Sequence, residues 1–147
     1  MKKPSKAKAS LQPKAPTPHI GAKKGEIAPL VLLSGDPVRT EWIAKTFLKN
    51  VRCVTKVRGL LGFTGTYNGV LVTIMTSGMG QPTLGIIVTE LITVYDVKKI
   101  IRVGSAGSLQ AHIKKMDIVI ATGASTDSGM NNARFPFCHF APIADPS

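Results

Sequence analysis

The sequence has 147 residues, of which 44% are hydrophobic, which is enough for one domain with a buried core. This composition excludes a wholly disordered chain and a collagen-like repeat, and two cysteines are too few for a disulfide framework or a cysteine metal site. The formal net charge is +11, but seven lysines lie in residues 1–24, where there is no acidic residue, so the remainder carries +4.

Residues 1–16 consist mostly of Lys, Pro, Ala and Ser, which cannot bury enough apolar surface to offset the entropy of ordering. We expect a basic, disordered tail. A contact with nucleic acid is the alternative, but the tail has no aromatic or arginine residues that could stack on bases, so we expect no nucleic-acid partner. Because the sequence has neither a bilayer-length apolar run nor a signal-peptide pattern, we expect no membrane association and a cytoplasmic protein.

The first predicted elements are a buried strand and a helix. Ala28–Ser34 is an apolar run that ends at the turn Gly35-Asp36-Pro37. Proline suits the first position of a helix and aspartate suits the N-cap, so a helix is predicted to begin at Pro37. Its apolar residues at helical spacing are Val38, Trp42, Ile43 and Phe47.

Further along the chain, Gly59–Tyr67 and Val70–Met75 are predicted to pair as a hairpin, because Asn68-Gly69 is a strong hairpin turn signal. An amphipathic helix is predicted after Pro82. Its apolar residues recur at helical spacing: Leu84, Ile87, Val88, Leu91, Ile92 and Tyr95.

Two more strands are predicted at Lys99–Val103 and Asp117–Ala121. The alternation of strands and helices, with nearly continuous apolar strands, is typical of the α/β class. We therefore expect a twisted mixed β-sheet flanked by helices.

Three glycine-bearing turns follow predicted strands, at residues 35–37, 78–80 and 104–107. At the carboxyl ends of strands, such turns let backbone N–H groups approach an anion, although each pattern taken alone favours an ordinary tight turn. Arg39 and Arg102 lie near these turns. Arg102 stands in an apolar strand, so we expect it to be buried with an anion or, alternatively, with a carboxylate in an internal salt bridge.

Six segments of the chain, in order, resemble a known family: TPHIGAKKGEIA (17–28), SGDPVR (34–39), VRGLLGFTGTYNG (57–69), SGMGQP (77–82), KKIIRVGSAG (98–107) and TDSGMNNARF (126–135). Together they are similar to the DeoD-type purine nucleoside phosphorylases of the nucleoside phosphorylase superfamily. The resemblance runs almost continuously from Thr17 to Asp145. It implies a truncated nucleoside phosphorylase-like fold in which residues 17–147 form the N-terminal portion of the domain.

The resemblance also assigns roles to individual residues. It implies that phosphate is bound by Gly35, Arg39, Arg102 and Ser105, and by Arg58 from the neighbouring subunit. The implied ribose and base contacts are His19 from the neighbouring subunit, Met79, Ala106 and Gly107. For Arg39 and Arg58 a solvated surface charge is the alternative reading, and for His19 an exposed position in the tail.

The implied activity is reversible phosphorolysis of purine nucleosides, in an oligomer of identical subunits, with inorganic phosphate as co-substrate and no cofactor or metal. In this family an aspartate protonates the leaving base, and we expect that aspartate to lie beyond Ser147. The alternative is a truncated, non-catalytic phosphate-binding remnant, or a partner of full-length subunits. With the closing strands missing, we expect an exposed sheet edge and self-association.

Overall fold

The computed structural model describes residues 13–138 and 140–146, so most of the predicted tail lies outside the described residues. The chain divides into two compact units, residues 1–104 and 105–147. The single domain over residues 17–147 stays a prediction.

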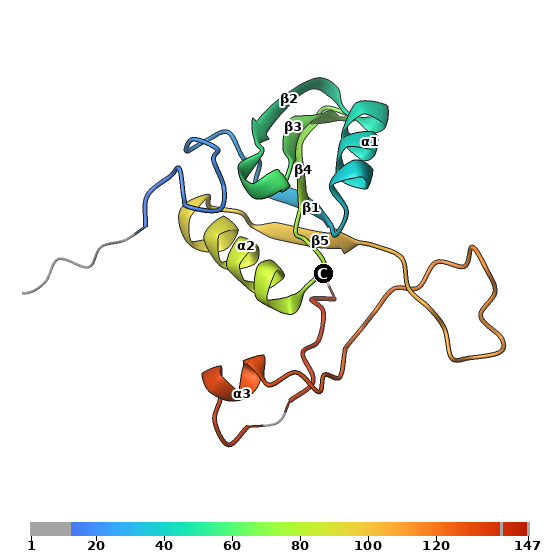
Figure 1. Ribbon diagram of the computed structural model, residues 1–147. Helices are drawn as coiled ribbons and strands as arrows, with labels where there is room; N and C mark the ends of the chain where they lie inside the picture. The colour runs from blue at the N-terminus through green and yellow to red at the C-terminus, as the bar shows by residue number, and fades with distance from the viewer. Residues whose placement is uncertain (1–12, 139, 147) are drawn as a thin grey trace, which may run out of the picture. The chain divides into compact units, whose positions relative to one another are not determined.

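The first unit contains a mixed sheet with the strand order β2-β3-β4-β1-β5 (Figure 1). Its strands are β1 Leu30–Ser34, β2 Lys49–Thr55, β3 Gly62–Tyr67, β4 Val70–Thr76 and β5 Lys99–Val103. β1 pairs in parallel with both β4 and β5, whereas β2, β3 and β4 pair antiparallel. The predicted mixed sheet is confirmed.

Helix α1, Pro37–Phe47, begins as the sequence predicts. The Asp36 side chain accepts a hydrogen bond of 2.9 Å from the N–H of Val38, and the backbone of Asp36 is extended, as an N-cap requires. The hydroxyl of Thr40 donates to the Asp36 carbonyl at 3.0 Å, so the first turn of the helix is held from two directions.

Removing this cap should destabilise the first unit measurably. Asp36→Ala is expected to lower the free energy of unfolding by about 1 kcal/mol, because the N–H of Val38 loses its acceptor. Asp36→Asn, which keeps an acceptor oxygen, is the matched control. Urea unfolding followed by circular dichroism measures both, and an equal loss in the two variants would show that the cap contributes nothing.

The predicted hairpin is also confirmed. Tyr67 pairs with Val70 across the turn, and Asn68 and Gly69 both have positive φ angles of 47° and 80°. Two consecutive left-handed residues make the turn whose twist matches that of the flanking strands, and Asn-Gly adopts it most readily.

The two faces of the sheet carry two separate apolar clusters. Val31 and Leu33 of β1 belong to the cluster that packs on α2, Gln81–Val94, through Ile87 and Leu91. The other β1 side chains, Leu30 and Leu32, pack against the second cluster on the α1 side. Alternate side chains of a strand point to opposite faces of the sheet, so a nearly continuous apolar run indicates a strand that is covered on both faces. Figure 1 shows α1 and α2 on opposite sides of the sheet.

The edge strands differ from the central ones. β2 was not predicted, because its first five residues are exposed and give no apolar alternation. β5 was predicted, but it lies at the other edge of the sheet, and Ile101 on it is 54% exposed. β5 is thus an edge strand of the sheet, and the expected self-association stays a prediction.

The second unit has little regular structure among its described residues: α3, Met130–Arg134, and one isolated bridge between Gly123 and Ile143. The strand predicted at Asp117–Ala121 is wrong. The segment has no ladder partner within the described residues, and Ile118 and Ile120 are exposed. An apolar, β-branched run becomes a strand only where another strand satisfies its backbone groups.

Candidate functional site

Three strands end side by side at one edge of the sheet, which we call the carboxyl edge. Ser34, the last residue of β1, is in register with Thr76 of β4 and with Val103 of β5. The N–H of Ser77 also donates to the Ser34 carbonyl at 2.8 Å. The register therefore brings together the three glycine turns that follow these strands, beginning at Gly35, Gly78 and Gly104.

The guanidinium of Arg102 lies among these turns. A methyl group added at Gly35 would lie 3.5 Å from Arg102 Nη2 and 3.4 Å from the carbonyl oxygen of Gly78. A methyl group added at Gly104 would lie 3.0 Å from Arg102 Nη1. The missing side chain at Gly104 thus leaves space for the guanidinium, and Gly35 lies within contact distance of it. The planar fork of the guanidinium suits bidentate contact with an oxyanion.

The expectation that Arg102 is buried is wrong, because β5 is an edge strand and Arg102 is exposed. The ion pairs among the described residues include neither Arg102 nor Arg39, so the alternative of an internal salt bridge also finds no support in this part of the chain. An exposed arginine without a carboxylate partner is available to an external anion.

Arg39 and Met79 also belong to the carboxyl edge. Arg39 is half-buried in the first turn of α1, beside the fully buried Thr40, whose hydroxyl accepts a 3.0 Å hydrogen bond from Thr76 at the end of β4. This contact fixes the start of α1 at the edge. Met79 follows Gly78, which has a φ of +73°, and its side chain is 94% exposed.

Three of the predicted site residues belong to the second unit. Ser105, Ala106 and Gly107 are its first residues, and all three are exposed. Their assigned contacts with phosphate and the base stay predictions.

Arg58 lies elsewhere along the sheet. It is exposed, with a φ of 54°, in the short 3-10 turn Val57–Gly59 before β3. The strand order places β3 three positions from β5, or about 14 Å at the usual strand spacing. Arg58 and Arg102 thus approach the carboxyl edge from separate strands.

His19 lies farther from the carboxyl edge, beside α2. Its Nδ1 is 2.6 Å from Oε1 of Glu90. Glu90 is nine residues after the first residue of α2, so this contact lies about 13 Å along the helix from the carboxyl edge. His19 is therefore not brought together with Arg102, and it is not free in a tail. The Glu90 contact was missed because it joins residues 71 positions apart.

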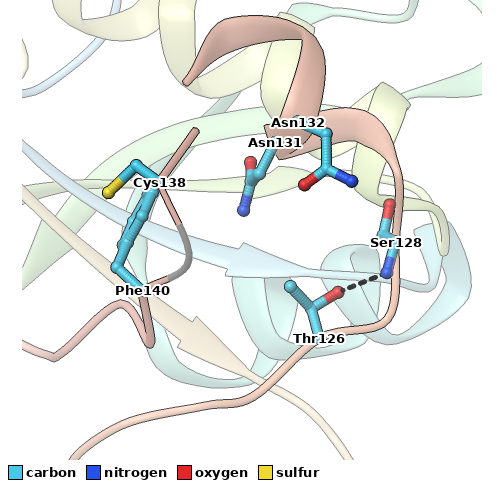
Figure 2. Close-up of a pocket in the computed structure, with 6 residues that line it drawn as sticks. All are labelled: Thr126, Ser128, Asn131, Asn132, Cys138 and Phe140. Carbon is cyan, nitrogen blue, oxygen red and sulfur yellow. Dashed lines mark hydrogen bonds between the residues drawn. The ribbon is translucent and has the colours of Figure 1, made fainter. Parts of the chain in front are cut away.

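A small pocket in the second unit was also not predicted. Figure 2 shows its lining residues: Thr126, Ser128, Asn131, Asn132, Cys138 and Phe140. The N–H of Ser128 donates to the hydroxyl of Thr126 at 3.0 Å, which stabilises the turn before α3. Several of these residues fall in the segment 126–135, one of those that carry the family resemblance.

Within residues 13–138 and 140–146, no three side chains of the His, Cys, Asp or Glu type are grouped so that they could hold a metal ion. No helix in this same part of the chain combines the length and apolar character needed to cross a membrane.

Comparison with known proteins gives a consistent result. A family described as the Phosphorylase superfamily matches residues 29–147. The DeoD-type purine nucleoside phosphorylase of Listeria monocytogenes serovar 1/2a is 55% identical over 127 residues, which cover 86% of this chain and 54% of that protein. The protein of the same name from Bacillus subtilis is 51% identical, with the same coverage.

A solved structure is similar as well. The uridine phosphorylase of Vibrio fischeri ES114 superposes with a TM-score of 0.75 and 33% identity, over 86% of this chain and 52% of that one. This chain therefore spans about half the length of the relatives that it matches.

Proposed function

This chain belongs to the phosphorylase superfamily, and from that premise we propose that it takes part in the reversible phosphorolysis of purine nucleosides to free base and ribose or deoxyribose 1-phosphate. The observation that carries the proposal is the Arg102 guanidinium among the glycine turns of the carboxyl edge. The names of the relatives at 51–55% identity support the purine class.

Phosphorolysis requires that the carboxyl edge bind and orient a phosphate. A phosphate oxygen attacks C1′ of the ribose while the N-glycosidic bond breaks, through a transition state with oxocarbenium character. Arg102 and Arg39 would neutralise the dianion. The backbone N–H of Gly35 and the hydroxyl of Ser105 would donate hydrogen bonds to it. Holding the nucleophile at attack distance and stabilising its charge are the main contributions such residues can make.

We further propose that the enzyme is an oligomer of identical subunits. Arg58 precedes a strand that lies three positions from β5, and the contact of His19 with Glu90 lies about 13 Å along α2 from the carboxyl edge. Their separation supports a role in a neighbouring subunit's site. A cytoplasmic location, a place in purine salvage and independence from cofactors belong to the same proposal.

A second candidate is supported by the location of the carboxyl edge. Of the phosphate contacts proposed within one chain, Gly35, Arg39 and Arg102 belong to the first unit, and Ser105 is the first residue of the second unit. A chain that binds phosphate without turnover, or that joins full-length subunits, would keep this edge intact.

One assay separates the two candidates. The purified chain is incubated with inosine, with and without inorganic phosphate, and hypoxanthine release is measured. Phosphorolysis predicts release that depends on phosphate and falls in Arg102→Ala, with Arg52→Ala as the matched surface-arginine control. Absence of release at high protein concentration, together with retained phosphate binding, would reject turnover by this chain and leave the binding role.

A further inference from the structure

Glu90 is held between two residues of the segment Thr17–Ala22, which precedes the sheet. Its Oε1 lies 2.6 Å from Nδ1 of His19, and its Oε2 accepts a hydrogen bond from the hydroxyl of Thr17. Glu90 is the one charged residue of α2, and its side chain is 15% exposed. A carboxylate that is mostly buried needs such partners, because an unpaired buried charge is costly.

Tyr95, just after α2, fixes the backbone on both sides of His19. Its hydroxyl oxygen lies 2.8 Å from the carbonyl oxygens of Ile20 and Ala22, and it accepts a 3.2 Å hydrogen bond from the N–H of Thr17. Ile20 and Ala22 are fully buried. The position of the His19 ring is therefore determined by contacts with both the main chain and Glu90.

This arrangement determines which ring nitrogen carries the proton. An ionised carboxylate only accepts hydrogen bonds, so the proton between Glu90 and His19 belongs to Nδ1. In the neutral ring Nε2 then carries a lone pair. Among the residues that the structure describes, Nε2 has no hydrogen-bond partner, and the His19 side chain is 30% exposed.

We propose that Glu90 is a positioning residue that keeps His19 in the Nδ1–H tautomer, so that Nε2 accepts a hydrogen bond from a hydroxyl group of a ligand. The identity of the ligand rests on the proposed function, which makes it a sugar hydroxyl of a nucleoside. A hydroxyl group can donate a hydrogen bond to the lone pair of Nε2. A fully ionised phosphate monoester cannot, because its oxygens only accept hydrogen bonds. His19 would thus favour nucleosides over nucleotides.

The tautomer can be measured without any turnover. Nitrogen-15 NMR of the labelled chain, recorded at a pH at which the rings are seen to be neutral, reports the proton position on each ring. We expect the Nδ1–H form for His19 in the wild type and in Glu90→Gln, which keeps an acceptor oxygen. Glu90→Ala should shift His19 to the tautomer mixture of an unconstrained histidine.

Thr17→Val is the matched control, because it removes the partner of Oε2 and leaves the contact between Nδ1 and Oε1. It should keep the Nδ1–H form, and the His112 and His139 signals should be the same in every variant. An Nε2–H form of His19 in the wild type, or an Nδ1–H form that persists in Glu90→Ala, would overturn the proposal.

An activity measurement tests the identity of the ligand that His19 contacts. Where phosphorolysis is observed, Glu90→Ala should raise the KM for inosine about tenfold, as expected for the loss of one hydrogen bond, and leave the KM for phosphate unchanged. Equal increases in both KM values would contradict the assignment of a sugar hydroxyl to His19. A wild-type chain without turnover would reject the proposed activity, while the NMR result would still decide the role of Glu90.

Discussion

We expect inorganic phosphate to raise the Tm of the wild-type chain and this increase to disappear in Arg102→Ala. A ligand that binds only the folded state stabilises it by mass action, by about 1–3 kcal/mol at tens to hundreds of times its Kd. Arg102 supplies the guanidinium that lies beside Gly35 and Gly104, so its loss should remove a charged contact of the proposed phosphate site.

Thermal melts with and without millimolar phosphate, at constant ionic strength, test this expectation. Arg52→Ala is the matched control, because Arg52 is an exposed arginine on β2, at the opposite edge of the sheet from β5. Lys14→Ala provides a second control in the segment before Thr17. Both controls should keep the full phosphate effect. A phosphate effect that survives in Arg102→Ala, or that is absent from the wild type, would place the anion elsewhere.

Leu91→Ala is expected to cause the largest loss of stability, about 2–5 kcal/mol. Leu91 is fully buried in the cluster that joins α2 to the sheet, beside Ile87 and Leu33. Truncating it removes apolar contacts and leaves a cavity that the surrounding strands can fill only in part. Urea unfolding monitored by circular dichroism gives the change in free energy.

The neighbouring residue provides the control for this substitution. Ile92 stands on the same helix but is 54% exposed, so Ile92→Ala should cost less than about 1 kcal/mol. Comparable losses in the two variants would mean that α2 does not pack on the sheet through its Leu91 face.

Most of the first unit could be predicted from local sequence signals. The cap at Asp36, the turn at Asn68-Gly69 and the apolar spacing of α2 each act over a few residues, so the sequence alone reveals them. β2 could not be predicted in this way, because its exposed residues are held in a strand by hydrogen bonds to β3 rather than by an apolar pattern. The segment Asp117–Ala121 shows the converse, since it has the pattern of a strand and no partner among the described residues.

The residues of the candidate site could be predicted from the sequence more readily than their arrangement in space. The motifs identified Gly35, Arg39 and Arg102, and the register of β1, β4 and β5 brings the turns of the carboxyl edge together. The exposure of Arg102 could not be predicted, because the apolar pattern of a strand does not reveal whether the strand lies at the centre or at the edge of the sheet. The contact between Glu90 and His19 depends on how the chain folds back, and no local pattern indicates it.

The open side of β5 has a consequence for how the protein behaves at high concentration. β5 pairs with β1 alone in the sheet, so the backbone groups on its other side can act as a template for a strand from another chain. Lys98 and Lys99 stand at the start of this row, where their like charges oppose the approach of a second β5. Salt weakens such repulsion between exposed charges, since the screening length is about 8 Å at physiological ionic strength. We therefore expect any association through this strand to increase with the salt concentration as well as with the protein concentration.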